Sequence, residues 1–70
     1  MNNATYHSKD QNWMNGSTTY WFDIDGELYG VVEGEGAGVV DSDGHPIDYN
    51  DDLRSDVERS CTVTDEMRAA

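Results

Sequence analysis

The chain has 70 residues and carries 15 Asp and Glu against 4 Lys and Arg, which gives a formal net charge of −11. This length suits one small domain, close to the lower limit at which a hydrophobic core alone holds a fold. The charge excludes direct binding to a nucleic-acid duplex, which requires clustered Lys and Arg, and it disfavours anionic membrane surfaces.

Residues 1–12 are polar and show no hydrophobic period. We therefore expect a flexible arm there, with at most a short strand near residues 4–7. The arm has no apolar stretch of the kind that a secretory signal contains, and the single cysteine, Cys61, has no partner for an internal disulfide. Both features lead us to expect a reducing compartment, the cytoplasm.

The next segments predict a β-hairpin. Asn15-Gly16 is a strong turn signal, and residues 18–24 and 27–33 are rich in β-branched and aromatic side chains, as strands are. The tetrapeptide at 23–26, Asp-Ile-Asp-Gly, is typical of a type I turn.

The register of this hairpin follows if a glycine bulge completes the turn, because Asp23 then faces Glu27 and Phe22 faces Leu28. Period-2 alternation assigns one face of the hairpin to the core. This core face would hold Tyr20, Phe22, Leu28 and Val32. The outward face would hold Thr19, Trp21, Asp23, Glu27 and Glu33.

A second hairpin and a helix follow. Residues 37–40 predict a short strand, the Asp-Ser-Asp-Gly at 41–44 a turn, and residues 45–49 a return strand, which Pro46 restricts to a sheet edge. Asn50 is the expected cap of a helix that begins at 51–52 and ends near Ser60.

The apolar side chains of this helix, Leu53, Val57 and Cys61, recur at i, i+4 and i+8 and share one face. Residues 62–70 would be an extended or frayed tail, although a longer helix that adds Thr64 and Met67 to the stripe is an alternative. The predicted fold is α+β: a small antiparallel β-meander of three to five strands in two hairpins, with one C-terminal helix, all within residues 13–61.

Catalytic and metal sites have little support in the sequence. The two Asp-x-Asp-Gly turns do not fit the ligand spacing of an EF-hand loop when either glycine is aligned with its invariant position. Cys61, His7 and His45 lack the arrangement of nucleophile, base and orienting group that catalysis needs. We expect no enzyme activity, no metal and no cofactor.

The acidic residues point instead to a basic partner. Residues 10–53 contain eleven Asp and Glu and no Lys or Arg. A globule of this length is about 28 Å across, and B-DNA of that length carries on the order of 16–17 phosphate charges, against 15 carboxylates here. The expected binding residues form two rows, one of Asp23, Asp25, Glu27, Glu33 and Glu35, the other of Asp41, Asp43, Asp48, Asp51 and Asp52.

Two aromatic residues add to this hypothesis. Trp21 and Tyr29 would both lie on the outward face, where aromatic anchors within a charged rim are typical of binding hot spots. The alternative is that the helix packs on them or that they cover the edges of a thin sheet.

In its size, its Lys- and Arg-free stretch at 10–53 and its acidic rows on a hairpin scaffold, the chain resembles the small phage-encoded inhibitors that mimic DNA, including several acidic anti-CRISPR proteins. The resemblance implies occlusion of the DNA-binding or PAM-reading site of a CRISPR effector, or of another DNA-handling protein. It implies a basic nucleic-acid-binding partner, no catalytic residue and, for a phage protein, the host cytoplasm. We expect a monomer or weak dimer.

Two other functions account for the same composition. Asp outnumbers Glu ten to five and Lys occurs once, which is typical of proteins adapted to molar salt, where the acidic surface serves solvation and the function is unrelated to charge. The chain also suits an antitoxin-like or regulatory module that binds a basic protein.

Overall fold

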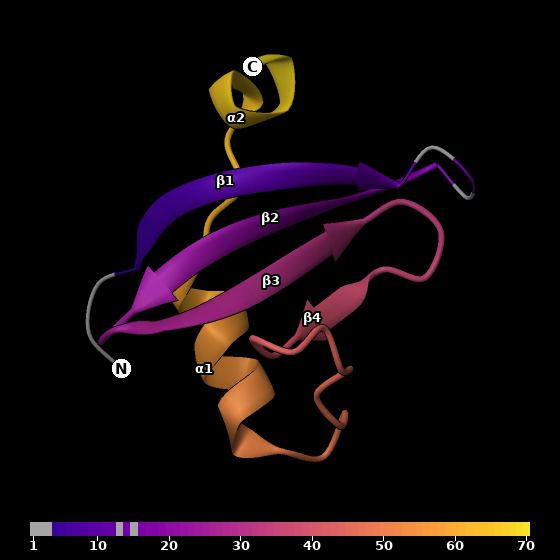
Figure 1. Cartoon of the computed structure of the whole chain (residues 1–70). Coiled ribbons are helices and arrows are strands. Elements are labelled where there is room, and N and C mark those ends of the chain that lie inside the picture. Colours follow the sequence, from indigo (N-terminus) through magenta and orange to yellow (C-terminus); the bar gives the residue numbers. More distant parts are fainter. Residues whose placement is uncertain (1–3, 13, 15) are drawn as a thin grey trace.

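The structure of the protein, a computed structural model, describes residues 4–12, 14 and 16–70. Four strands form one antiparallel sheet in the order β1-β2-β3-β4, and two short helices follow (Figure 1). The elements are β1 (Thr5–Asn12), β2 (Ser17–Ile24), β3 (Glu27–Glu33), β4 (Gly38–Val40), α1 (Asp52–Ser60) and α2 (Asp65–Ala69). The small α+β fold with an antiparallel meander is confirmed, with a second helix added.

The segment predicted to be a flexible arm forms the edge strand β1 instead. Residues 5–12 pair with β2 from Thr5 opposite Asp23 to Asn12 opposite Ser17, with a bulge at His7. A polar sequence can form this strand because an edge strand needs only one ladder, and its other side can remain exposed to water.

The register predicted for the β2–β3 hairpin is wrong by one residue. Asp25 and Gly26 both have positive φ, 55° and 87°, as the two central residues of a type I′ turn require. Ile24 therefore pairs with Glu27, and Phe22 pairs with Tyr29. Because successive side chains alternate between faces, this shift moves every side chain of β3 to the face opposite the predicted one.

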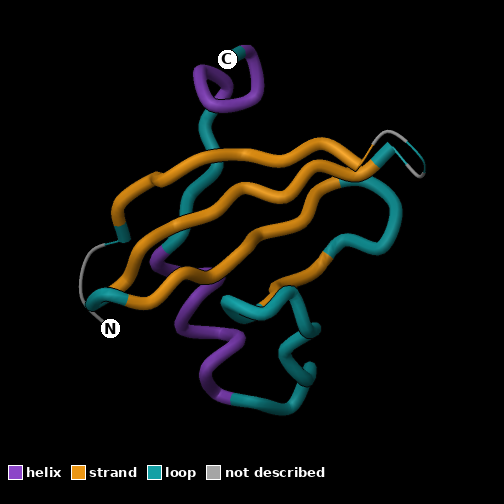
Figure 2. The backbone as a smooth tube through the Cα atoms, viewed as in Figure 1, coloured by secondary structure: helices purple, strands orange, loops and turns teal. Residues whose placement is uncertain are grey.

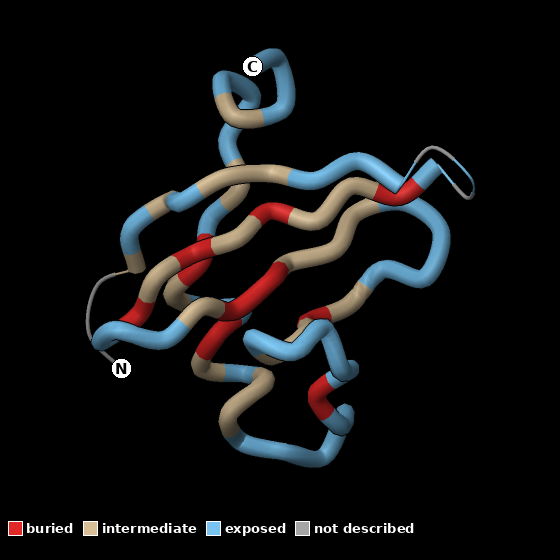
Figure 3. The backbone as a smooth tube through the Cα atoms, viewed as in Figure 1, coloured by how far each residue is buried: buried red, intermediate tan, exposed pale blue. Residues whose placement is uncertain are grey.

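The core lies between one face of the sheet and α1, and Figure 3 shows the buried segments in the strands and in this helix. Tyr29 is buried in it, whereas Leu28 and Val32 are only partly buried and lie outside the core cluster, contrary to prediction. The core residues are Tyr20, Phe22, Ile24, Tyr29, Val39, Ile47, Val57 and Cys61. We call this side of the sheet the covered face.

The return strand predicted at 45–49 is reduced to a bridge. Val40 pairs with Pro46, and the amide of Ile47 donates to the carbonyl of Val39 at 2.9 Å. Since Pro46 has no amide hydrogen, the ladder does not extend into a regular strand. Beyond the bridge the chain runs as a loop to α1 (Figure 2).

Helix α1 ends at Ser60, as predicted, but its cap is Asp51 in place of Asn50. The Asp51 carboxylate accepts a hydrogen bond from the amide of Leu53 at 2.9 Å. Val57 is fully buried beneath the sheet. Cys61 is buried beside it, and burial raises the pKa of its thiol to about 11.

The predicted frayed tail contains α2, which Thr64 caps through a hydrogen bond from the amide of Met67. Lys9 on β1 donates from Nζ to the carbonyl oxygens of Met67 and Arg68, at 3.2 and 3.0 Å. These bonds satisfy carbonyl groups that the end of a helix leaves unpaired. Among the described residues, no helix has the length and apolar character needed to cross a membrane.

Candidate interaction surface

The sheet has a second face that neither helix covers in Figure 1, where α1 passes behind the strands. The strand pairings and period-2 alternation place Trp21 at its centre, next to Gly30 of β3. We call this surface the open face. Its side chains include Asp10, Thr19, Trp21, Asp23, Leu28, Val32 and Val40.

Trp21 lies over Gly30 on the open face, as predicted for its outward position. A Cβ built at Gly30 would come within 3.1 Å of Trp21 Cζ3, and closer still to methyl groups of Val40 and Thr19. Only glycine leaves room for the indole to lie this close to the backbone of β3. The indole Nε1 donates to Asp10 Oδ2 at 3.0 Å, which fixes the orientation of both side chains.

A hollow of about 210 Å³ adjoins this pair. Its lining residues come from β1, β2, β3 and the turn after β4: His7, Ser8, Asp10, Trp21, Leu28 and Ser42. Sequence reasoning missed Asp10 as a binding residue because it assigned β1 to a flexible arm. Its pairing opposite Thr19, two residues from Trp21, becomes visible only once β1 joins the sheet.

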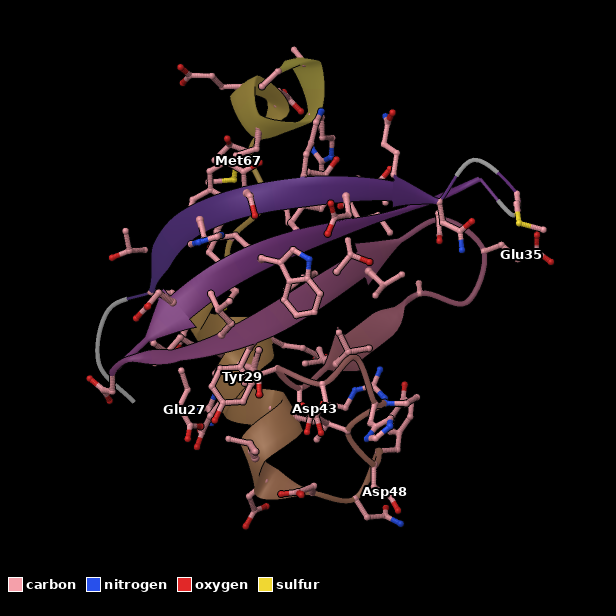
Figure 4. The ribbon with its side chains drawn as sticks, viewed as in Figure 1. Glu27, Tyr29, Glu35, Asp43, Asp48 and Met67 are labelled. Carbon is pink, nitrogen blue, oxygen red and sulfur yellow. The ribbon has the colours of Figure 1, made fainter. Side chains whose placement is uncertain are left out.

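The first acidic row does not lie on one face. Asp23 belongs to the open face, whereas the register places Glu27 and Glu33 on the covered face. Figure 4 shows Glu27 and Glu35 at opposite ends of the sheet, and the six steps of β3 from Glu27 to Glu33 span about 20 Å. Asp25 is exposed at the β2–β3 turn.

Tyr29 is not an exposed anchor, contrary to the first prediction for it, and it is covered, as the alternative expects. It is 8 % exposed in the core, and its hydroxyl donates to Glu27 Oε2 at 2.9 Å. That hydrogen bond, together with burial and the nearby charges of Glu27 and Asp41, raises the pKa of Tyr29. One carboxylate of each expected row, Glu27 and Asp41, therefore acts on the Tyr29 hydroxyl.

Three carboxylates of the second row accept hydrogen bonds from backbone amides. Asp41 Oδ1 accepts from the amides of Asp43 and His45, both at 2.9 Å, Asp48 Oδ1 accepts from Asn50, and Asp51 caps α1. The side chains of Asp43 and Asp48 lie below the sheet in Figure 4. Asp52, the first residue of α1, is exposed.

Three residues in the loop after β4 have side chains of the kind that bind cations. Ligand atoms of Asp41, Asp43 and His45 lie within 4.8 Å of one another. The spacing Asp-x-Asp-Gly-His indicates this group of three side chains in the sequence. A comparison with the EF-hand loop alone does not identify the group. The turn explains this proximity without a metal ion, because Asp41 already binds the backbone of both other residues.

All four Lys and Arg side chains of the chain belong to the covered side of the molecule. Lys9 contacts α2, Arg54 and Arg59 belong to α1, and Arg68 belongs to α2. The arginines form ion pairs with Glu58, Asp56, Glu33 and Asp65. Of these four carboxylates, Glu33 alone comes from the stretch 10–53, so the chain's cations do little to neutralise that stretch.

Comparisons of the chain with known protein families, with curated proteins and with solved structures give no match.

Proposed function

We propose that the protein is an inhibitory binding protein whose acidic surface takes the place of a nucleic-acid backbone in the binding groove of a basic protein. The resemblance to anti-CRISPR proteins favours a CRISPR effector, blocked at its PAM-reading site, as the target. Another DNA-handling protein is the broader form of the same proposal.

The observation that carries the proposal is the placement of every Lys and Arg of the chain on the covered side, away from the open face. The cations lie on the helices or against them, while the open face presents Asp10 and Asp23 around Trp21. If the charged side chains served solubility alone, both signs would be distributed over the whole surface. A surface of one sign attracts an oppositely charged groove and speeds association.

The dimensions of the protein support the same function. Its longest extent is 30 Å, and B-DNA of that length carries about 18 phosphate charges, against 15 carboxylates in the chain. The acids are attached to turns and strands that local hydrogen bonds hold in place, as at Asp41 and Asp48. A groove made for phosphates would therefore meet carboxylates that are held in fixed positions.

The experiment is competition for DNA. A fluorescent duplex is bound to a guide-loaded CRISPR effector or to other purified DNA-handling proteins, and its displacement by the protein is measured. We expect displacement from at least one of them, weakening steeply as salt rises, because the screening length shortens to about 3 Å at 1 M. Failure to displace DNA from any of them, at high excess and low salt, would contradict the proposal.

Matched pairs of variants distinguish an effect of the acidic surface on DNA displacement from an effect of net charge. Asp10→Asn with Asp23→Asn removes two charges from the open face and keeps acceptors for the Trp21 indole and the Gly26 amide. Glu58→Gln with Glu66→Gln removes two charges from the helices. We expect the first pair to weaken displacement about tenfold or more and the second by less than about threefold. Equal losses would show that net charge alone acts.

Salt-dependent folding tests the main rival. A protein adapted to molar salt gains much of its stability from screening among its own carboxylates, so it would unfold at 0.15 M salt. The proposed inhibitor must be folded at that concentration to act in a host cell. A chain found unfolded at 0.15 M and folded at 2 M would favour salt adaptation over the proposed function.

A further inference from the structure

The hollow beside Trp21 is too small for most small-molecule ligands. Its volume is about 210 Å³, whereas pockets for drug-sized ligands occupy about 300–1,000 Å³. It is lined by an indole, an aliphatic side chain and a carboxylate, from Trp21, Leu28 and Asp10. These groups suit one long side chain with an apolar stem and a cationic end.

The carboxylate in the hollow retains accepting capacity. Asp10 Oδ2 accepts the indole hydrogen of Trp21 at 3.0 Å, but a carboxylate offers about four lone-pair sites. Asp10 is exposed, so a second donor can reach it from solvent. The cation next to it in the sequence, Lys9, bonds to the end of α2 on the covered face and does not neutralise it.

The indole is held in a position where a planar cation can reach it. Trp21 packs over Gly30 and its Nε1 is fixed by Asp10, so binding a cation there requires little further ordering of the side chain. Trp is the aromatic side chain that attracts cations most strongly. The protein already contains one such contact, since the Arg54 guanidinium carbon lies 4.2 Å from the ring centroid of Tyr49.

We propose that this hollow receives an arginine side chain of the partner, with its guanidinium between the Trp21 indole and the Asp10 carboxylate and its methylene stem against Leu28. Arginine suits the site better than lysine because its planar group can stack on the indole while its N–H groups point at the carboxylate. The inference rests on the proposed function in taking the partner to be a basic protein.

The test uses Nα-acetyl-arginine amide as the probe, titrated into protein labelled with ¹⁵N and ¹³C and followed by NMR. Trp13→Phe in every sample leaves Trp21 as the single indole, since the chain has two Trp. We expect the Trp21 Nε1–H signal and the Leu28 methyl signals to shift with saturation, and Nα-acetyl-lysine amide to bind at least threefold more weakly. Equal shifts for both probes, or an unmoved indole signal, would overturn the inference.

Variants identify the two groups that hold the probe. Asp10→Asn retains an acceptor for the indole and removes the charge, so we expect about tenfold weaker binding of the arginine probe. Trp21→Leu removes the aromatic face and should weaken probe binding about fivefold, read from the Leu28 methyl signals. Asp56→Asn, which removes one charge from α1, is the control and should change the affinity by less than twofold. Equal effects of Asp10→Asn and Asp56→Asn would contradict a defined site.

The experiments distinguish failure of the arginine site from failure of the proposed function. If Trp21→Leu still displaces DNA from its target as the parent does, the arginine site is wrong while the inhibitor function stands. If the arginine probe binds the hollow but no DNA-handling protein is inhibited, the site stands and its basic partner lies in another class of protein.

Discussion

The guanidinium of Arg68 holds the carboxylate of Glu33 through two hydrogen bonds, from Nε to Oε1 at 3.0 Å and from Nη2 to Oε2 at 2.8 Å. The two residues are 35 positions apart, so the pair joins the last helix to the end of β3. Together with the bonds from Lys9 to the end of α2, it attaches the C-terminal segment to the sheet.

Arg68→Ala should therefore release α2 while the sheet remains folded. Both side chains are more than a third exposed, so the loss of global stability should be small. Amide exchange at Met67, which donates to the Thr64 hydroxyl, should accelerate. Hydrogen exchange followed by NMR measures both effects. Arg59→Ala, whose partner Asp56 is on the same helix, is the control. Unchanged exchange in α2 would contradict the role of the pair.

The same pair predicts an acid-dependent loss of stability. The hydrogen bonds from Arg68 lower the pKa of Glu33 below its ordinary value of 4.5. The stabilisation is therefore fully present above about pH 4.5 and is lost as the pH falls through the lower pKa of the folded state. The difference in urea stability between the parent and Glu33→Gln should be constant from pH 8 to 6 and shrink below pH 4.5. A difference that grows in acid would reverse the assignment.

Val57 is the place where α1 is most sensitive to truncation. Its side chain is completely buried, and Val57→Ala removes two buried methyl groups, so the free energy of unfolding should fall by about 2 kcal/mol. Val32→Ala removes the same atoms from the partly exposed open face and should cost less than about 1 kcal/mol. Urea unfolding compares the two, and equal losses would show that the open face is covered in solution.

Cys61 should resist alkylation in the folded protein. Burial raises the pKa of its thiol to about 11, so little thiolate exists at pH 8, and the thiolate is the reactive form. Iodoacetamide labelling followed by mass spectrometry should be slow in buffer and rapid in denaturing urea. Rapid labelling of the native protein would mean that α1 leaves the sheet far more often than the buried position of Val57 implies.

Gly30→Ala should disturb the open face directly. The added Cβ would lie 2.6 Å from a methyl of Val40 and 2.8 Å from a methyl of Thr19, which overpacks the site and should destabilise it by about 1–3 kcal/mol. Because the Cβ also comes within 3.1 Å of Trp21, the near-ultraviolet circular dichroism of the indole should change. Gly38→Ala is the control, because Gly38 is not in the left-handed region and its added Cβ would meet no atom closer than 3.7 Å. It should leave that spectrum unaltered.

Much of the secondary structure could be predicted because local signals agree there. Residues 18–24 and 27–33 correspond to β2 and β3 within one residue, and α1 ends at Ser60 as expected. The register of the β2–β3 hairpin could not be predicted, because Asp-Ile-Asp-Gly is compatible both with a four-residue type I turn and with a two-residue Asp-Gly loop. The type I′ pairing brings the ring of Tyr29 into the core, a long-range packing preference that no local pattern reveals.

The candidate site was harder to predict than the fold. Trp21 was placed on the correct face, but Asp10, its hydrogen-bond partner, belongs to a strand whose polar sequence carries no period. Such an edge strand is defined by its pairing with β2, and pairing is a tertiary interaction. The expected row from Asp23 to Glu33 failed because it depended on the register of β3.

The order β1-β2-β3-β4 has a kinetic consequence. Each strand pairs with its neighbour in the sequence, so the sheet can grow by closing short loops, and chains with such local contacts fold quickly. The bond from Lys9 to Met67 joins residues 58 positions apart, and we expect it to form after the main folding barrier. Substitutions that loosen α2 should accordingly speed unfolding and leave the folding rate nearly unchanged.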